Sequence, residues 1–269
     1  MGGFDMGGAT GVERLKASLN QYYMEHKIHP HGFACPHRDV CAGTSDQFVE
    51  AKMPSIGDRY GQDGLPRILV VSLDPGDEGD EPKDRTVHIR STDDWSFVQA
   101  QENKNSHWYR THELVHALLL RFKPDLPWEE VTRYFAHTNS AKCSQRKDGN
   151  RKADPVLFRN CRAYIPGEIA LFDPEIIITQ GNEAWYILER SFEKVSAEEH
   201  CCENHGITET ISVVAVPTGG LALWLHTYHP TSDRYGGYFS RYKPHYCECY
   251  PEIAWRFLQG QYLPRTPHT

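Results

Sequence analysis

The sequence of 269 residues has no long apolar run, no internal repeat and no low-complexity stretch. Its longest hydrophobic run is centred on Ile68–Val71, whereas a membrane-spanning helix needs ~20 apolar residues. Residues Met1–Thr10 are rich in glycine and lack the basic start and apolar core of a signal peptide. We therefore expect a protein that stays out of membranes and works in a cytoplasm of the bacterial type.

An excess of positive charge is also missing. The formal net charge is −7 at pH 7, and non-specific affinity for nucleic acids comes mostly from neutralised phosphates. A local basic face can still coexist with this acidic balance. The stretch Lys142–Lys152 (KCSQRKDGNRK) holds five Lys or Arg residues and one Asp, and it is either a solvated loop or part of such a face.

The residues that are present suffice for a folded domain. Hydrophobic residues make up 39%, aromatic residues 12% and charged residues 24%, which is typical of globular chains and not of disordered ones. The length suits one large α/β domain or two small ones. Because no linker interrupts the chain, we expect a single monomeric domain over residues 1–269, with an N-terminal helix and a loop that contains cysteines.

Short apolar, β-branched runs alternate with helical segments along the chain. A continuous run such as RILVVSL is typical of a strand buried on both faces. We expect strands at Arg67–Leu73, Tyr134–Thr138, Glu175–Thr179, Ser212–Val216 and Leu223–Tyr228, and helices at Val12–His26, Trp108–Phe122, Asp154–Phe172, Glu183–Phe192 and Pro251–Gln259. This alternation predicts a three-layer α/β/α sandwich around a central, mostly parallel, four-stranded sheet.

Three polar residues directly follow three of the expected strands: Asp74, Asn139 and His229. Ligands of open α/β sheets bind outside the carboxyl ends of the strands, so the three side chains would meet in one crevice if their strands are parallel neighbours. Each also has an ordinary explanation. Asp74 could simply form a turn with Pro75 and Gly76, and His229 could cap a backbone group.

Eight cysteines are present: Cys35, Cys41, Cys143, Cys161, Cys201, Cys202, Cys247 and Cys249. Without a secretory signal, a metal site or buried free thiols are favoured over a disulfide framework. The segments His200–His205 and His245–Cys249 have no recognised metal-ligand spacing, and we interpret both as structural or exposed.

The segments around the three polar residues resemble motifs of the uracil-DNA glycosylase superfamily. Ser72–Gly76 (SLDPG) is similar to its water-activating motif. Thr138–Cys143 (TNSAKC) resembles the Thr-Asn-x-x-Lys-Cys of the iron–sulfur (family 4) branch, and His226–Ser232 (HTYHPTS) resembles the Thr-x-His-Pro-Ser loop. The motifs agree in order and strand context over Arg67–Ser232, which is most of the chain.

The resemblance implies a DNA glycosylase that flips a base out of DNA and hydrolyses its N-glycosidic bond. A carboxylate beside the sugar stabilises an oxocarbenium-like state and orients a water, a role that suits Asp74. A donor aimed at the departing base stabilises its anion, which suits His229. A carboxamide donates and accepts at once and can read a pyrimidine edge, which suits Asn139. Because no lysine stands beside Asp74, we expect no covalent Schiff-base intermediate.

The resemblance also implies a [4Fe–4S] cluster held by four thiolates. The ligands after the Asn motif and in the following helix correspond to Cys143 and Cys161, and the N-terminal pair corresponds to Cys35 and Cys41. The N-terminal spacing here is C-x5-C, whereas the branch has C-x2-C, so this pair matches less closely. Tetrahedral zinc and buried free thiols are the alternatives.

The partner that the resemblance implies is DNA, duplex or single-stranded, with a modified base. The loop that enters the duplex in family members matches Ser232–Tyr235, where Arg234 or Tyr235 would fill the vacated space or contact phosphates; an exposed turn is the alternative. Lys142 would contact the DNA backbone, and Ser72 would line the substrate pocket. The candidates for the aromatic residue that stacks on the flipped base are Trp95, Phe97, Trp108 and Tyr109.

The substrate is left open by two departures from the iron–sulfur branch. Asp74 stands where that branch usually has alanine, and Asp77–Ser106 is polar and lacks the usual stacking segment. Uracil and a hypermodified pyrimidine, such as glucosylated hydroxymethylcytosine removed in defence against phages, are therefore both candidates. Two other functions stay open: a reader that binds a modified base without cleaving it, and a zinc-stabilised nucleic-acid-binding protein.

Overall fold

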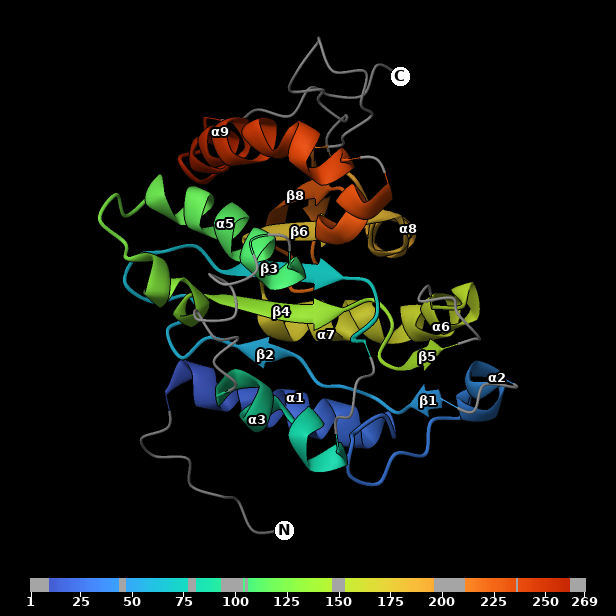
Figure 1. The fold of residues 1–269 in the computed structure, drawn as a ribbon. Helices are drawn as coiled ribbons and strands as arrows, with labels where there is room; N and C mark the ends of the chain where they lie inside the picture. Colours follow the sequence, from blue (N-terminus) through green and yellow to red (C-terminus); the bar gives the residue numbers. More distant parts are fainter. Residues whose placement is uncertain are drawn as a thin grey trace.

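A computed structural model describes residues 10–43, 47–76, 81–92, 104, 106–146, 153–195, 211–235 and 237–261, which form a three-layer α/β/α sandwich (Figure 1). The helices are α1 (Gly11–Glu25), α2 (Arg38–Ala42), α3 (Val87–Thr92), α5 (His107–Leu120), α6 (Pro155–Cys161), α7 (Ile165–Phe172), α8 (Asn182–Ser191) and α9 (Tyr238–Leu258), with short 3₁₀ helices η1 (Pro82–Arg85), η2 (Trp128–Arg133), η3 (Arg162–Tyr164) and η4 (Pro230–Tyr235). The strands are β1 (Gln47–Val49), β2 (Ser55–Ile56), β3 (Ile68–Ser72), β4 (Phe135–Asn139), β5 (Ser144–Arg146), β6 (Ile176–Gln180), β7 (Ile211–Ala215) and β8 (Leu221–Thr227). The predicted fold class is confirmed.

The main sheet has six strands in the order β2-β4-β3-β6-β8-β7. Its four central strands are mutually parallel, whereas β2 and β7 pair antiparallel at the two edges. The central part of the sheet therefore has the four strands that were expected. One further strand pairs antiparallel at each edge. The strands that the sequence did not predict are β1, β2 and β5, which are only two or three residues long and too short to show a periodic pattern.

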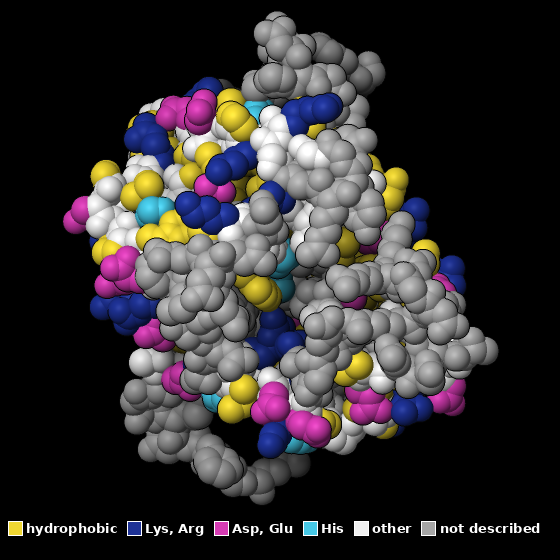
Figure 2. Space-filling model, in the orientation of Figure 1, with side chains coloured by type: hydrophobic (Ala, Val, Ile, Leu, Met, Phe, Trp, Pro, Cys, Tyr) yellow, Lys and Arg dark blue, Asp and Glu magenta, His cyan; other side chains and the backbone are white. Residues whose placement is uncertain are grey.

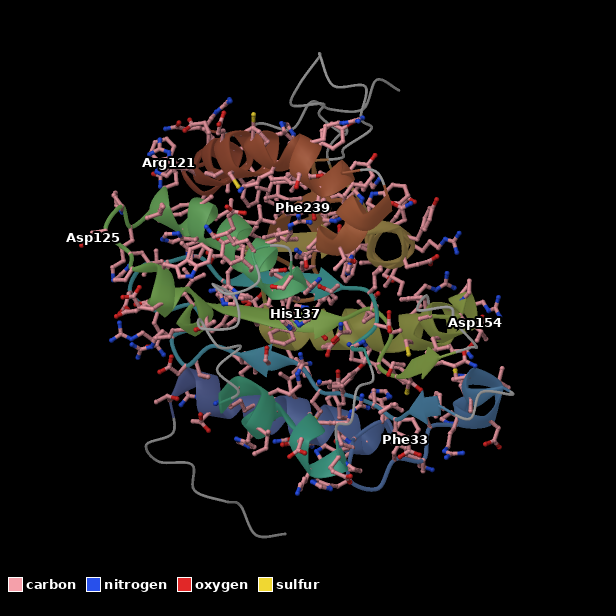
Figure 3. All side chains as sticks on the ribbon, in the orientation of Figure 1. Phe33, Arg121, Asp125, His137, Asp154 and Phe239 are labelled. Carbon is pink, nitrogen blue, oxygen red and sulfur yellow. The ribbon has the colours of Figure 1, made fainter. Side chains whose placement is uncertain are left out.

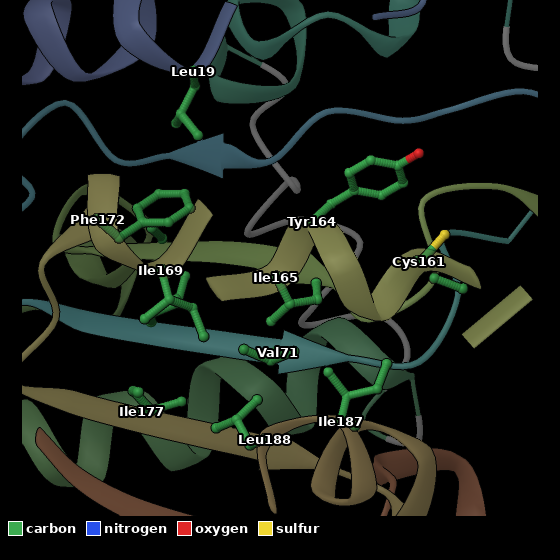
Figure 4. Packing of buried hydrophobic residues seen from close by; sticks show 14 of the residues in the cluster. Leu19, Val71, Cys161, Tyr164, Ile165, Ile169, Phe172, Ile177, Ile187 and Leu188 are labelled. Atoms are coloured by element: carbon green, nitrogen blue, oxygen red, sulfur yellow. The ribbon is translucent and has the colours of Figure 1, made fainter. Parts of the chain in front are cut away.

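Both faces of the sheet are covered by helices, so its central strands are buried throughout. On β3, Ile68 and Val70 belong to the core beneath α5 and α9, while Leu69 and Val71 belong to the core shared with α1, α6, α7 and α8. Figure 4 shows the second core, in which side chains of α7 and α8 pack on Val71 of β3. Burial on both faces explains why the strands read as continuous apolar runs.

Two predicted helices differ from the observed ones, and proline explains both differences. The segment expected as one helix from Asp154 to Phe172 is divided into α6, η3 and α7, with Pro166 in the first turn of α7, because proline has no N–H for a helix interior but is tolerated at a helix start. The last helix begins at Tyr238, not at Pro251, and contains Pro244 and Pro251.

The long helix α9 tolerates these prolines because it buries aromatic side chains against α5 and the sheet. Phe239, Tyr246 and Tyr250 are all at most 1% exposed, and burial of one such side chain contributes about 1.5–3 kcal/mol. Neither α9 nor any other helix of the described residues is long and apolar enough to cross a membrane.

Candidate active site at the carboxyl edge of the sheet

The register of the sheet places the ends of the four parallel strands side by side. Ser72 pairs with Asn139 across β3 and β4, and Gln180 pairs with Thr227 across β6 and β8. Asp74 follows β3, Asn139 ends β4 and His229 follows β8. The three residues singled out in the sequence therefore belong to strands of one parallel set, which point to the same edge of the sheet (Figure 1).

The half-buried Asp74 lies in a loop that is fixed to the loop after β4. The backbone N–H of Ala141 donates to the carbonyl oxygen of Leu73 at 3.1 Å. The hydroxyl of Ser144 donates to the carbonyl oxygen of Gly76 at 2.6 Å. These bonds hold the backbone on both sides of Asp74, so the carboxylate is presented from a fixed loop.

The carboxamide of Asn139 is buried beside Ser72. Asn139 is 4% exposed, and its Oδ1 has no hydrogen-bond partner among the residues that the structure describes. A buried polar atom without a partner costs about 1–3 kcal/mol, and native proteins hold few such atoms. This oxygen is therefore a candidate acceptor for a ligand.

The side chain of Lys142 is buried and bonds to the backbone of Asn139. Lys142 is 1% exposed, and its Nζ donates to the Asn139 carbonyl oxygen at 2.7 Å and to Thr138 Oγ1 at 2.9 Å. It also forms an ion pair with the fully buried Glu168 at 2.5 Å. All three ammonium hydrogens are thus engaged inside the protein, which contradicts the predicted contact between Lys142 and the DNA backbone.

The imidazole of His229 is fixed in one tautomer. Its Nδ1 accepts from the backbone N–H of Thr231 at 3.3 Å and lies 2.8 Å from the hydroxyl of the same residue. Desolvation lowers the pKa of His229 to about 4, so the ring is neutral at physiological pH. A neutral ring whose Nδ1 is an acceptor carries its proton on Nε2, which is then the available donor.

A polar cluster lies on the side of the sheet that faces α5, next to these residues. The hydroxyl of Ser72, which is 2% exposed, donates to Gln180 Oε1 at 2.8 Å and lies 2.8 Å from His137 Nε2 and 3.3 Å from His107 Nε2. Burial lowers the pKa of His107 and of His137 well below the usual value. Figure 3 labels His137 on β4. This hydroxyl therefore already has polar partners within the protein. The contact of Ser72 with substrate stays a prediction.

The sequence analysis missed His107, His137 and Gln180. A signal existed for Gln180, because it ends β6 and precedes Gly181 just as Asn139 ends β4. His107 gave no signal, since it lies at the first position of α5 and only the fold brings it beside His229, with ring centroids 4.9 Å apart.

The candidates for the stacking aromatic are separated by the fold. The Trp108 ring contacts those of His107 and His137, at centroid distances of 5.0 and 4.7 Å, so it borders the polar cluster. Tyr109 instead packs on Trp128 at 5.2 Å. Trp95 and Phe97 lie outside the described residues.

The segment predicted to enter the duplex, Ser232–Tyr235, lies within the short helix η4, which directly follows His229. The guanidinium of Arg110, from α5, donates to the carbonyl oxygen of Pro230 at the start of this helix. The side chains of Arg234 and Tyr235 lie outside what the structure describes, so their predicted roles stay predictions. On the face drawn in Figure 2, Lys or Arg side chains and histidines lie together near the centre.

The four cysteines predicted as cluster ligands line one small pocket: Cys35, Cys41, Cys143 and Cys161. Three of the sulfurs have polar neighbours. The backbone N–H of Lys142 donates to Cys161 Sγ at 3.2 Å, Asn160 donates to Cys41 Sγ at 3.3 Å, and the Tyr164 hydroxyl lies 3.6 Å from Cys35 Sγ. Hydrogen bonds of this kind stabilise metal-bound thiolates and tune clusters. Four thiols are the donor type that an iron–sulfur cluster uses, although no three of them are arranged around a single metal ion.

No group of three or more His, Cys, Asp or Glu side chains in the described part of the chain is arranged to hold a metal ion. Cys247 and Cys249 lie half-buried on α9. Cys201 and Cys202 fall outside the described residues.

The comparisons with known proteins agree with this geometry. Residues 59–236 match the family model described as the uracil DNA glycosylase superfamily, and this range contains Asp74, Asn139 and His229. A search of curated proteins found no match. Because the family model covers well over half of the chain, the protein belongs to the uracil-DNA glycosylase superfamily, a family of DNA glycosylases.

Proposed function

We propose that the protein is a monofunctional DNA glycosylase that flips a modified pyrimidine out of DNA and hydrolyses its N-glycosidic bond. The observation that carries the proposal is the placement of Asp74, Asn139 and His229 at or just after the ends of β3, β4 and β8, three strands of one parallel set that end at the same edge of the sheet. A carboxylate, a carboxamide with an unpaired oxygen and a neutral histidine donor are the groups that this reaction requires.

His229 stabilises the departing base in this proposal. As the glycosidic bond breaks, its electron pair moves onto the base, which becomes an anion. The Nε2–H of the neutral imidazole donates a hydrogen bond to that anion, and the ring stays neutral. Such donors act strongly in a water-poor site. The fixed tautomer of His229 supports this role.

Asp74 and Asn139 act on the other two parts of the substrate. The Asp74 carboxylate stabilises the positive charge on the sugar and orients a water, whose oxygen bonds to the anomeric carbon while the carboxylate accepts a proton. The buried carboxamide of Asn139 bonds to the edge of the flipped base. The buried ion pair of Lys142 fits a reaction without a lysine adduct, because this ammonium is engaged with Glu168.

We also propose a [4Fe–4S] cluster held by Cys35, Cys41, Cys143 and Cys161. All four cysteines line one pocket, and four thiolates are the usual ligands of such a cluster. The bound cluster would tie the N-terminal segment to α6 and to the loop after β4.

The proposal is tested by measuring base release by mass spectrometry from two DNAs after incubation with anaerobically purified protein. One DNA carries uracil, and the other is phage DNA with glucosylated hydroxymethylcytosine. Release of uracil alone indicates a repair enzyme, and release of the bulky base alone indicates antiviral defence. Release of neither base would contradict the proposal.

The variant Asp74→Ala separates the glycosylase from a reader that binds a modified base without cleaving it. We expect this variant to bind the same DNA and to release the base at least about 100-fold more slowly, the lower end of the range typical of general-base catalysis. Unchanged release would show that Asp74 does not activate the water. A protein–DNA adduct trapped by borohydride would contradict the hydrolytic mechanism.

A further inference from the structure

We propose that His107 is a positioning residue that holds the imidazole of His229 in place for the reaction. His107 belongs to none of the three motif segments, and it lies at the first position of α5. The two imidazole rings have centroids 4.9 Å apart and an interplanar angle of 32°, so the ring of His107 packs against that of His229. The inference deepens the proposed function, because it concerns the same site.

Two other contacts also restrain His229, in different ways from His107. Thr231 bonds to Nδ1 and so fixes the rotation of the ring about its own axis. Gly181 approaches from the end of β6 so closely that an added Cβ would lie 3.2 Å from the Cβ of His229. Neither contact limits tilting of the ring out of its plane, and the packed ring of His107 does.

His107 is itself anchored from the sheet. Its Nε2 lies 3.3 Å from Ser72 Oγ, and the single hydroxyl hydrogen of Ser72 goes to Gln180 Oε1 at 2.8 Å. His107 must therefore donate to Ser72, which places the proton of its neutral ring on Nε2. Gln180 also accepts from Thr111 of α5 at 3.2 Å. The ends of β3 and β6 thus fix the ring that supports His229.

The importance of such support follows from the geometry of catalysis. A hydrogen-bond donor stabilises a leaving group only when it points at the position where the charge develops. A displacement of about 1 Å can reduce a rate about 100-fold. A half-buried histidine just beyond a strand end needs a neighbouring group to hold it at this accuracy, and His107 is the ring packed on it.

Two variants of the same position test the proposal. In His107→Phe a planar ring remains, and in His107→Ala it is lost. We expect His107→Ala to lower the single-turnover rate of base release about 100-fold, with affinity for the uncleaved DNA unchanged, and His107→Phe to recover most of the rate. His116→Ala is the matched control, because it removes an imidazole of the same helix that bonds to Leu126 and lies outside the site.

A second readout does not need activity. In protein labelled with ¹⁵N-histidine, the two ring nitrogens of His229, assigned with His229→Gln, report its tautomer by NMR. Well-separated shifts in the wild type and in His107→Phe, and shifts moved toward each other in His107→Ala, would support the proposal even if no base were released from the DNAs above. Should His107→Ala fail to fold, His107→Leu replaces it.

Two outcomes would overturn the inference. If His107→Ala keeps both the wild-type rate and the wild-type nitrogen shifts, His107 does not position His229. If His107→Phe is as impaired as His107→Ala in both readouts, packing of a planar ring does not position His229. Loss of base release in the wild type, with intact nitrogen shifts, would instead contradict the proposed function alone.

Discussion

At the scale of single residues, the site depends on groups whose protonation is set by burial. His229 and His226 both have pKa values lowered to about 4 by desolvation, but His226 lies on β8 and His229 lies beyond its end. His226 bonds to Thr179 at 3.0 Å within the core near α8. Of the two histidines, only His229 belongs to the candidate site at the carboxyl edge of the sheet. Position relative to the strand end, and not the pKa alone, therefore distinguishes the histidine that is proposed to act in the reaction.

The pH dependence of base release follows from the lowered pKa of His229. The ring must be neutral, so its contribution is complete well above pH 4 and is lost as the pH falls through about 4. We expect the acid limb assigned to His229, measured by single-turnover rates in wild type and His229→Gln, to lie near pH 4. A limb near pH 6.5, the value of a free histidine, would show that the ring is solvated.

The free energy of unfolding is also expected to decrease as the pH falls. The unfolded state takes up a proton on this histidine near pH 6.5, whereas the folded state does so only near pH 4. Stability therefore decreases as the pH falls from about 6.5 toward 4. Urea unfolding of the wild type and of His229→Gln at several pH values measures this contribution, which should be smaller in the variant.

At the scale of elements, the buried ion pair between Lys142 and Glu168 joins the loop after β4 to α7. Tyr23 of α1 and Thr138 of β4 also donate to Glu168. Removing one partner leaves a buried charge, which costs about 3–5 kcal/mol. We expect Glu168→Leu to lose about this much stability in urea unfolding.

The double variant Lys142→Met/Glu168→Leu is the control for this pair. Replacement of both partners by apolar side chains leaves no unpaired charge, so most of the lost stability should return. A double variant that is no more stable than Glu168→Leu would show that the charges do not act as a pair.

The turn between β6 and α8 also connects an element to the site. Gly181 has φ +93°, and an added Cβ would lie 3.1 Å from Leu73 and 3.2 Å from His229. We expect Gly181→Ala to slow base release more than its loss of stability explains. Gly219→Ala is the matched control, because Gly219 has φ +87° but no atom within 4 Å of an added Cβ. Equal rates in the two variants would contradict this expectation.

The sequence predicts the elements with strong patterns and misses those without them. The five longer strands and α1, α5 and α8 correspond to the predicted segments within a few residues, because burial on two faces or one gives a clear apolar pattern. The start of α9 was missed since two prolines in a segment normally argue against a helix. Strands β1, β2 and β5 exist through their partners and not through their own composition.

The same contrast applies to the site. Three site residues could be predicted because each lies at or just after the end of a strand with a clear apolar pattern: Asp74, Asn139 and His229. Lys142 was misassigned because its charge was visible but its buried partner Glu168 lies on a helix far along the chain. His107 was missed because its neighbours Ser72 and His229 come from two other segments.

At the scale of the whole molecule, the cysteine cavity joins the N-terminal part to the rest of the domain. Cys35 and Cys41 precede the main sheet in sequence, whereas Cys143 and Cys161 follow β4 and end α6. We expect Cys143→Ser to lower the thermal unfolding temperature and the absorbance near ~400 nm of a thiolate-bound cluster. Cys247→Ser, on α9, is the control and should change neither.

A wild-type protein without that absorbance would remove the cluster from the proposal. A colourless anaerobic preparation with stoichiometric zinc would instead favour the structural metal. In either case the glycosylase site could still be tested separately, because none of the four cysteines is Asp74, Asn139 or His229.

The position of Lys142 has a consequence for chemical damage to this protein. Its backbone N–H bonds to the sulfur of Cys161, and its ammonium bonds to the carbonyl oxygen of Asn139. Oxidation of that sulfur would disturb Lys142, which also holds the backbone of Asn139, the residue proposed to read the base. We therefore expect oxidation at the cysteine pocket to weaken the proposed recognition of the base.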